Sequence, residues 1–225
     1  MKLQFYIGFL LLFYCNQNLA QSIQLLSTDS KASFRGLSVV DDRTVWVSGS
    51  NGTVGKSTNG GRTWHFQTIP GFEKTDFRDI EAFDSNHAII MGIDCPAVIL
   101  NTDDGGQNWK IVFRDTTKGM FLDAMEFNDS NYGVVIGDPL NGRAFVAKKY
   151  KEKEWTPNSF DRRPVLDSGE AFFASSGSNI KFISRIDAVA VTGGLQSNLL
   201  INQKKIRLPM LQGKESTGAN SIAVK

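Results

Sequence analysis

Short apolar runs recur along the chain, and most of them stop at a glycine. They are Val45–Val47, Ala88–Met91, Gly133–Ile136 and Ala188–Val191. Runs of this length that stop at turn residues are typical of buried β-strands. No segment after the first twenty residues has the length and 3.6-residue period of a helix. The pattern therefore predicts an all-β protein built from short strands.

The strands belong to a repeat of about 45 residues. Trp109 follows Trp64 by 45 positions, and Trp155 follows Trp109 by 46. The segments Ser57–Trp64 and Thr102–Trp109 share a hydroxyl residue, then Asn or Asp, then Gly, at fixed distances before the tryptophan. Four short strands in a unit of this size indicate a β-propeller blade.

Further anchors keep the same period and divide the chain into blades. The matched segments are Phe34–Gly36, Phe77–Asp79 and Phe121–Asp123, and, in a second set, Glu81–Phe83, Met125–Phe127 and Glu170–Phe172. We expect blades at about 30–70, 71–115, 116–160 and 165–210, with residues 211–225 opening a fifth.

The first twenty residues indicate export. Lys2 precedes an apolar run, Leu3–Tyr14, that is too short to span a bilayer, and Ala20 offers a small residue for cleavage. We expect a signal peptide over 1–20, a mature domain over 21–225 and a secreted or periplasmic location. A lipoprotein anchored at Cys15 is the alternative, although Tyr14 stands where a small residue is needed.

The composition argues against several classes of function. The formal net charge is +2, and loss of Lys2 leaves no basic footprint for nucleic acid. His65, His87 and the single mature cysteine, Cys95, are too few for a transition-metal cluster. No nucleotide fingerprint or haem motif occurs, so we expect no cofactor and no metal. No later stretch is long and apolar enough to cross a membrane.

The repeated turn resembles the Asp-box, or bacterial neuraminidase repeat, written S/T-x-D-x-G-x-x-W. The second copy matches every key position, the first has Asn59 in place of Asp, and Lys148–Trp155 keeps only the tryptophan. The resemblance implies that the carboxyl or amide holds the turn, that Gly adopts a positive φ and that Trp packs between strands or blades. The residues given this structural role are Ser57, Asn59, Gly61, Trp64, Thr102, Asp104, Gly106 and Trp109.

Among proteins with such turns, the chain is similar to the photosystem II assembly factor family. The Gly-Gly-x-x-Trp turns and strands that end at Gly, such as Trp46–Gly49, carry this resemblance. It implies a non-enzymatic protein that holds partner proteins, although the photosynthetic role need not carry over. Propellers of that family have more blades than four, which predicts that this sequence covers part of a ring.

A ligand or partner site is expected on the face opposite the repeated turns. The candidates lie at the start of innermost strands or just after the strand-ending glycines: Arg35, Arg78, Asp79, Asp123, Asp94 and Asp138, together with Asn51. Arginine suits carboxylates and peptide groups, so Arg35 and Arg78 are the leading binding residues for a protein or glycan partner. The same charges could instead satisfy one another around a central channel.

A glycosidase is the rival hypothesis. Phe34–Leu37 loosely resembles the Phe-Arg-Ile-Pro segment of sialidases but lacks its Ile-Pro half. Asp79 and Asp123 could act as the paired carboxylates of other glycoside hydrolases. We retain a non-catalytic binding or scaffold module as the main hypothesis.

Overall fold

The fold was examined in a computed structural model, which describes residues 30–225 except 94, 152, 176 and 202–203. The expected signal peptide, residues 1–20, lies outside the described residues, and so does the candidate Asp94.

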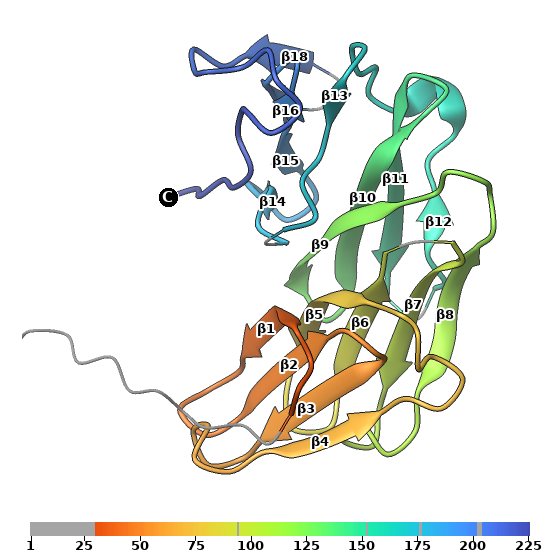
Figure 1. The fold of residues 1–225 in the computed structure, drawn as a ribbon, viewed down its shortest axis with the longest axis vertical. Coiled ribbons are helices and arrows are strands. Elements are labelled where there is room, and N and C mark those ends of the chain that lie inside the picture. Colours follow the sequence, from red (N-terminus) through yellow and green to blue (C-terminus); the bar gives the residue numbers. More distant parts are fainter. Residues whose placement is uncertain (1–29, 94, 152, 176, 202–203) are drawn as a thin grey trace, which may run out of the picture.

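Four antiparallel sheets, each of four strands in sequence order, follow one another along the chain (Figure 1). We number the sheets as blades 1 to 4. Blade 1 contains β1 (Phe34–Val39), β2 (Val45–Gly49), β3 (Thr53–Ser57) and β4 (His65–Thr68). Blade 2 contains β5 (Phe77–Ala82), β6 (Ala88–Gly92), β7 (Ala97–Thr102) and β8 (Lys110–Asp115). Blade 3 contains β9 (Leu122–Asp129), β10 (Tyr132–Leu140), β11 (Arg143–Tyr150) and β12 (Thr156–Pro157).

Blade 4 is more irregular. Its sheet contains β14 (Ile180–Phe182), β15 (Ala188–Val191), β17 (Asn198–Ile201) and β18 (Lys204–Arg207). A separate pair, β13 (Glu170–Ala171) and β16 (Gly193–Gly194), adjoins it, and η1 (Phe160–Arg162), a single 3-10 turn, precedes it. The described residues contain no other helix, and this turn is too short to span a membrane.

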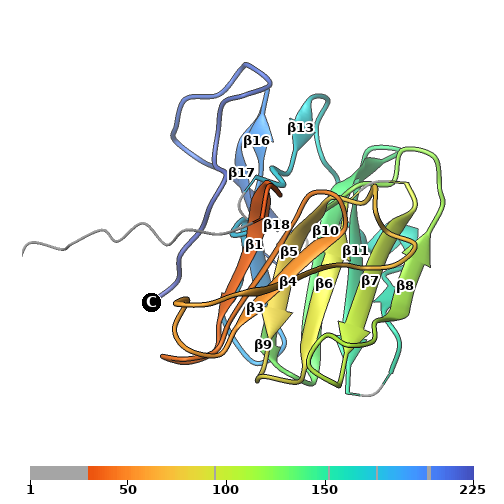
Figure 2. The same cartoon turned by 60° about the horizontal axis from the view of Figure 1, so that its bottom comes forward.

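The blades form an open arc. Contacts join β1 to β5, β5 to β9 and β9 to β14, so these are the innermost strands of successive blades. Figure 1 shows the arc, which is open between blades 1 and 4, and Figure 2 shows the strands of blades 1 to 3 side by side from another direction. The predicted all-β propeller with four-stranded blades is confirmed, as an unclosed arrangement of the described residues.

The core lies between the blades. A separate apolar cluster lies at each of the three interfaces, with Trp46 and Phe77 between blades 1 and 2, Met91 and Leu122 between blades 2 and 3, and Ile180 between blades 3 and 4. Alternation along each strand produces this arrangement, because successive side chains point to opposite faces of a sheet.

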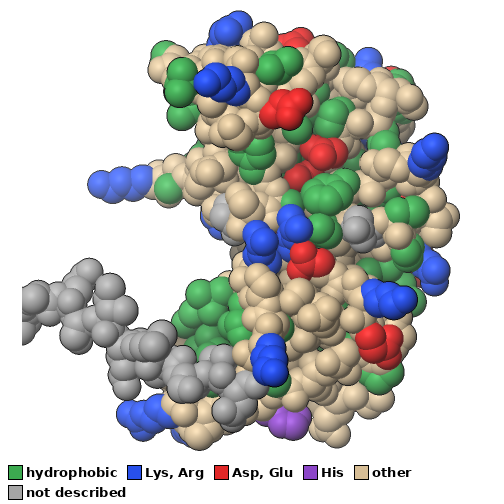
Figure 3. All heavy atoms as spheres, viewed as in Figure 1, with side chains coloured by type: hydrophobic (Ala, Val, Ile, Leu, Met, Phe, Trp, Pro, Cys, Tyr) green, Lys and Arg blue, Asp and Glu red, His purple; other side chains and the backbone are tan. Residues whose placement is uncertain are grey.

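The outward face of blade 1 has no neighbouring blade. Leu37 and Val39 point away from blade 2 and are 65% and 64% exposed. Phe66 lies on the same face, where its ring covers Gly55 and stacks on Phe34 at 5.5 Å. Figure 3 shows hydrophobic side chains gathered at this end of the arc.

The register predicted for the innermost strand of blade 4 was wrong. Glu170–Phe172 was expected to repeat Glu81–Phe83 in an innermost strand, but the innermost strand of blade 4 is Ile180–Phe182. Glu81 pairs with Ile89, and the residue in the same register of blade 4 is Lys181, which pairs with Val189. The apolar residues around Glu170 suggested an innermost strand. Glu170 lies outside the blade sheet instead, where it is fully buried among polar partners.

The expected opening strand of a fifth unit, Gly218–Lys225, also forms no strand. Gly218 makes one isolated bridge to Gly193, and the Ile222 amide donates to the Ser178 carbonyl at 2.9 Å. This segment therefore lies against blade 4 in an irregular conformation.

Candidate functional site

A β-bulge at the start of the innermost strand recurs in blades 1, 2 and 3. The strand pairings skip Arg35 in blade 1, Arg78 in blade 2 and Asp123 in blade 3. A bulged residue is left out of the ladder and its side chain is re-aimed, which is why bulges often occur beside functional sites. The three residues therefore occupy one equivalent position.

This register corrects one sequence match. Leu122, and not Phe121, stands where Phe34 and Phe77 stand, because Leu122 pairs with Gly137 as they pair with Gly49 and Gly92. Leu122 is fully buried like Phe77 and fills the same place in the blade core.

The structure brings Asp123, Arg78 and Asp138 together. Asp123 is 1% exposed, and neither carboxyl oxygen has a hydrogen-bond partner in the described part of the chain. Burial, with the nearby Asp138 charge, raises the pKa of Asp123 to about 9, although Arg78 opposes the shift. The carboxyl is therefore neutral at pH 7.

Asp79 has a different position and role. It is the residue after the bulge, equivalent to Gly36 in blade 1, and it is buried. Its carboxyl accepts hydrogen bonds from the Ile80 amide at 2.9 Å and the Met125 amide at 2.8 Å, so it links β5 to β9. Burial raises the pKa of Asp79 to about 8, against the opposing effect of the Met125 amide. These contacts make it a clamp between blades 2 and 3.

Asp138 differs from expectation. Asp138 was placed in a loop after Gly137, but it lies inside β10 at an irregular step in the ladder. It is half-buried, accepts a hydrogen bond from the Phe172 amide at 3.3 Å, and has a pKa raised by burial. It was misplaced because Gly137 and Pro139 flank it, and glycine and proline so close together usually indicate a turn.

Arg78 and Arg35 differ in their exposure and in their polar contacts. Arg78 is half-buried and its Nε lies 2.8 Å from Asp76 Oδ2. Arg35 is exposed and makes no hydrogen bond or ion pair with any described residue. Asn51 forms a tight exposed turn with φ of 58°. Of the candidates, Arg35 is therefore the one whose charge is most open to a partner.

Sequence reasoning missed a second row of charges along the innermost strands. Glu81, Glu126 and Lys181 occupy the same register position in blades 2, 3 and 4. Lys181 Nζ lies 2.6 Å from Glu126 Oε2. Burial, with the Glu126 charge, raises the pKa of Glu81 to about 7. The repeated Glu at this position was visible as a spacing anchor, but its charge was not used.

A polar cluster around Glu170 was also missed. The Thr192 hydroxyl and the Asn198 amide both donate to Glu170 Oε1, at 2.5 and 2.8 Å, and Lys205 lies 3.1 Å from Oε2. Buried charges require such partners. Thr192, Asn198 and Lys205 are far from Glu170 in sequence, so no local pattern could have shown the cluster.

The second repeated turn is held by its own side chains. The Thr102 hydroxyl donates to Asp104 Oδ1 at 2.9 Å and accepts from the Gly106 amide at 2.9 Å. Asp104 Oδ1 also accepts from the Asn108 amide at 2.9 Å, and this bond is the main reason why the pKa of Asp104 is lowered to about 2. Gly106 has φ of 90°, which glycine adopts without strain.

The first turn repeats this geometry with an amide. The Ser57 hydroxyl donates to Asn59 Oδ1 at 3.0 Å, the Gly61 amide donates to Ser57 Oγ at 2.9 Å, and the Thr63 amide donates to Asn59 Oδ1 at 2.9 Å. A neutral Asn can therefore take the place of Asp because the turn needs an acceptor oxygen and not a charge.

The tryptophans after these turns are half-buried. Trp109 packs edge-on against Trp46 of blade 1 at 6.4 Å between ring centroids. The Trp64 indole donates to the Gly61 carbonyl at 3.0 Å and stacks on Phe66 at 5.7 Å. Both contacts are structural, and neither involves the residues of the bulge position.

The described residues also bear on two other kinds of chemistry, metal binding and glycoside hydrolysis. They contain no group of three or more His, Cys, Asp and Glu side chains arranged to hold a metal ion. The two carboxyls proposed for a glycosidase, Asp79 and Asp123, are both buried, whereas a glycosidase acid must reach the sugar. The geometry favours binding at exposed polar groups over catalysis by this pair.

The fold defines the chain as a β-propeller protein. Comparison with known proteins then places it beside one family: residues 16–119 match the family model described as Photosynthesis system II assembly factor YCF48. The chain resembles that family, as its turns and strand ends predict. No curated protein matches the chain.

One solved structure supports the fold, and two others are similar with lower scores. A structure described as "YCF48 bound to D1 peptide" is 13% identical, with a TM-score of 0.52, and the match covers 82% of this chain and 69% of that one. YCF48 from Cyanidioschyzon merolae is 15% identical over 82% of this chain and 87% of that one, with a TM-score of 0.32. The WD40 β-propeller domain of Doa1 is 12% identical over 83% and 87%, also with a TM-score of 0.32.

Proposed function

We propose that this protein is an exported, non-catalytic propeller that binds a partner protein through the face that presents Arg35 and Arg78. The observation that carries the proposal is the repeated bulge, which places an arginine at the same position of two adjacent blades. Guanidinium groups pair with carboxylates and peptide carbonyls, so two of them on neighbouring strands suit an extended acidic segment.

The comparisons support a protein partner. The family match spans blades 1 and 2, the two blades that carry the arginines. A protein with the same fold has been solved with a bound peptide. For this chain we propose the same kind of partner, a peptide segment of another protein, without assigning the photosynthetic partner.

The proposal can be tested with synthetic peptide arrays that carry acidic residues, each peptide with a free or an amidated C-terminus. We expect wild type to bind acidic peptides, and Arg35→Ala to weaken binding roughly tenfold through loss of a charge-assisted contact. Arg114→Ala is the matched control, because Arg114 is exposed on the outer strand β8. Equal binding by wild type and Arg35→Ala would contradict the proposal.

The same preparation tests the glycosidase hypothesis and export. Hydrolysis of chromogenic glycosides that is lost in Asp79→Asn or Asp123→Asn would show an enzyme instead. Mass spectrometry of the protein from its own cell should give an N-terminus at Gln21. An intact Met1, or a lipid on Cys15, would argue against the proposed export route.

A further inference from the structure

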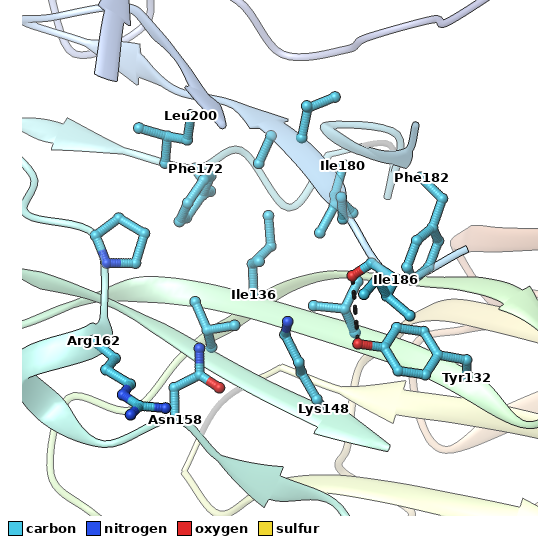
Figure 4. Close-up of a pocket in the computed structure, with 16 residues that line it drawn as sticks. Tyr132, Ile136, Lys148, Asn158, Arg162, Phe172, Ile180, Phe182, Ile186 and Leu200 are labelled. Carbon is cyan, nitrogen blue, oxygen red and sulfur yellow. Dashed lines mark hydrogen bonds between the residues drawn. The ribbon is translucent and has the colours of Figure 1, made fainter. Parts of the chain in front are cut away.

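A cleft of about 260 Å³ lies between blades 3 and 4 (Figure 4). Its walls come from β10 and β11 on one side and from β14, β15 and β17 on the other. Ile136, Phe172, Ile180 and Leu200 make it largely apolar, and Figure 4 shows these side chains facing one another across it. Tyr132 closes one end, where its hydroxyl donates to the Ile186 carbonyl at 3.4 Å.

The interface between blades 2 and 3 has a cleft of its own, of about 450 Å³ and lined by Trp155, and comparison with it shows which side chain the later interface lacks. The strand pairings make Phe182 of blade 4 equivalent to Phe127 of blade 3. Between blades 2 and 3, the buried Trp155 packs edge-on against Phe127 at 5.7 Å. Trp155 directly precedes the outermost strand of its blade, as Trp109 does in blade 2.

Blade 4 has no such tryptophan. The residue that precedes its outermost strand is Gln203, which lies outside the described residues, and Trp155 is the last tryptophan of the sequence. No indole from blade 4 can therefore pack on Phe182, and the ring that contacts Phe182 is Tyr132 of blade 3, edge-on at 5.6 Å. An interior void without partner atoms loses dispersion contacts, so a ligand that filled it would regain them.

The charges around the cleft indicate which kind of ligand would bind there. Lys148 and Arg162 line it, and none of its lining residues is acidic. Lys148 makes no ion pair with a described residue, and Figure 4 shows its amino group directed into the cleft. An apolar wall with cations at the rim is complementary to an apolar molecule that ends in an anion.

We propose that this cleft binds a small aliphatic or aromatic carboxylate. Its apolar part would lie between Phe172, Ile180 and Leu200, and its carboxylate would meet Lys148. The site shares no residue with the proposed peptide-binding face, so the two proposals stand independently.

Isothermal titration calorimetry of the full chain with octanoate tests the proposal, with octanol and octyltrimethylammonium as neutral and cationic probes. We expect octanoate to bind at one site, octanol to bind roughly tenfold more weakly and the cation not to bind. Lys148→Glu, at an exposed rim position, should weaken octanoate roughly tenfold or more, while Lys118→Glu, at an exposed lysine outside the cleft, should not.

A second variant fills the cleft. Ala188→Phe places a ring among the lining residues and should abolish octanoate binding while the circular dichroism spectrum stays that of wild type. If Ala188→Phe fails to fold, the comparison of Lys148→Glu with Lys118→Glu still tests the proposal. Absent octanoate binding, equal affinity for the cation, or equal binding by both lysine variants would overturn the proposal. A wild-type dimer that Ala188→Phe converts to monomer would also overturn it, because a second copy would then fill the cleft.

Discussion

Blades 2 and 3 and blades 3 and 4 both meet around a cleft, but the first cleft is lined by several charged residues and by Trp155, whereas the second is largely apolar. Both interfaces have the same strand order and equivalent pairing, and each places a phenylalanine, Phe127 or Phe182, at the same register position. Only the first has a tryptophan, Trp155, against that ring. The difference shows that the backbone repeat sets the geometry between blades, while the side chains decide which groups line the space between them.

The largest effect is expected when Trp155 is removed from the interface between blades 2 and 3. Trp155→Ala should destabilise the fold by about 3–5 kcal/mol, since it leaves a cavity beside Phe127 and Ala147. Denaturant unfolding measures the change. A loss below about 1 kcal/mol would mean that Trp155 does not determine how the interface packs.

A second comparison concerns the bulge position, where blades 1 and 2 carry arginine and blade 3 carries the buried Asp123. The pKa of Asp123 is about 9 in the fold against about 4 in an unfolded chain, so the folded state binds the proton more strongly. Stability should be greatest below pH 4 as far as this group is concerned and should fall as pH rises toward 9. Between pH 6 and pH 8 we expect a loss of roughly 2 kcal/mol from this group.

Asp123→Asn tests that assignment, because an amide stays neutral at every pH. Its stability should vary less between pH 6 and pH 8 than that of wild type, while Asp42→Asn, at an exposed loop position, should follow wild type. Melting curves at several pH values give the comparison. Parallel pH profiles for wild type and Asp123→Asn would show that another group carries the dependence.

Trp109 provides an intermediate case. It occupies the same position as Trp155 but is only half-buried against Trp46. Trp109→Ala should therefore cost about 2 kcal/mol, less than Trp155→Ala, as roughly half of the buried area is lost. The order of the two denaturation midpoints is the measurement, and the reverse order would contradict the link between burial and cost.

The smallest effect is expected in the turns. Asp104→Asn should leave the melting temperature at pH 7 almost unchanged, because Asn59 already makes the equivalent bonds in the first turn. Asp104→Ala should lower the melting temperature, since it removes the acceptor of the Asn108 amide. The lowered pKa of Asp104 also predicts that wild type loses this contribution as pH falls toward 2, whereas Asp104→Asn does not.

Much of the fold could be predicted because the repeat is periodic. The spacing of Trp64, Trp109 and Trp155, together with short apolar runs, was sufficient for a propeller of four-stranded blades. The register of the strands was harder to predict. A slip of one residue, as at Phe121, still leaves an apolar residue at the motif, but it changes which side chain lies at the bulge. In blade 4 the apolar residues near Glu170 imitated a strand motif that lies ten residues later.

The sequence by itself determined the strands, the repeated turns and the arginines that begin adjacent blades, because these depend on residues close together in the chain. Only the tertiary structure decided which charges are buried together and where an interface stays open. Asp123 has its high pKa because distant segments exclude water from it. The cleft beside Phe182 lies where blade 4 supplies no tryptophan, and Tyr132 of blade 3, edge-on to Phe182 at 5.6 Å, covers only one end of it.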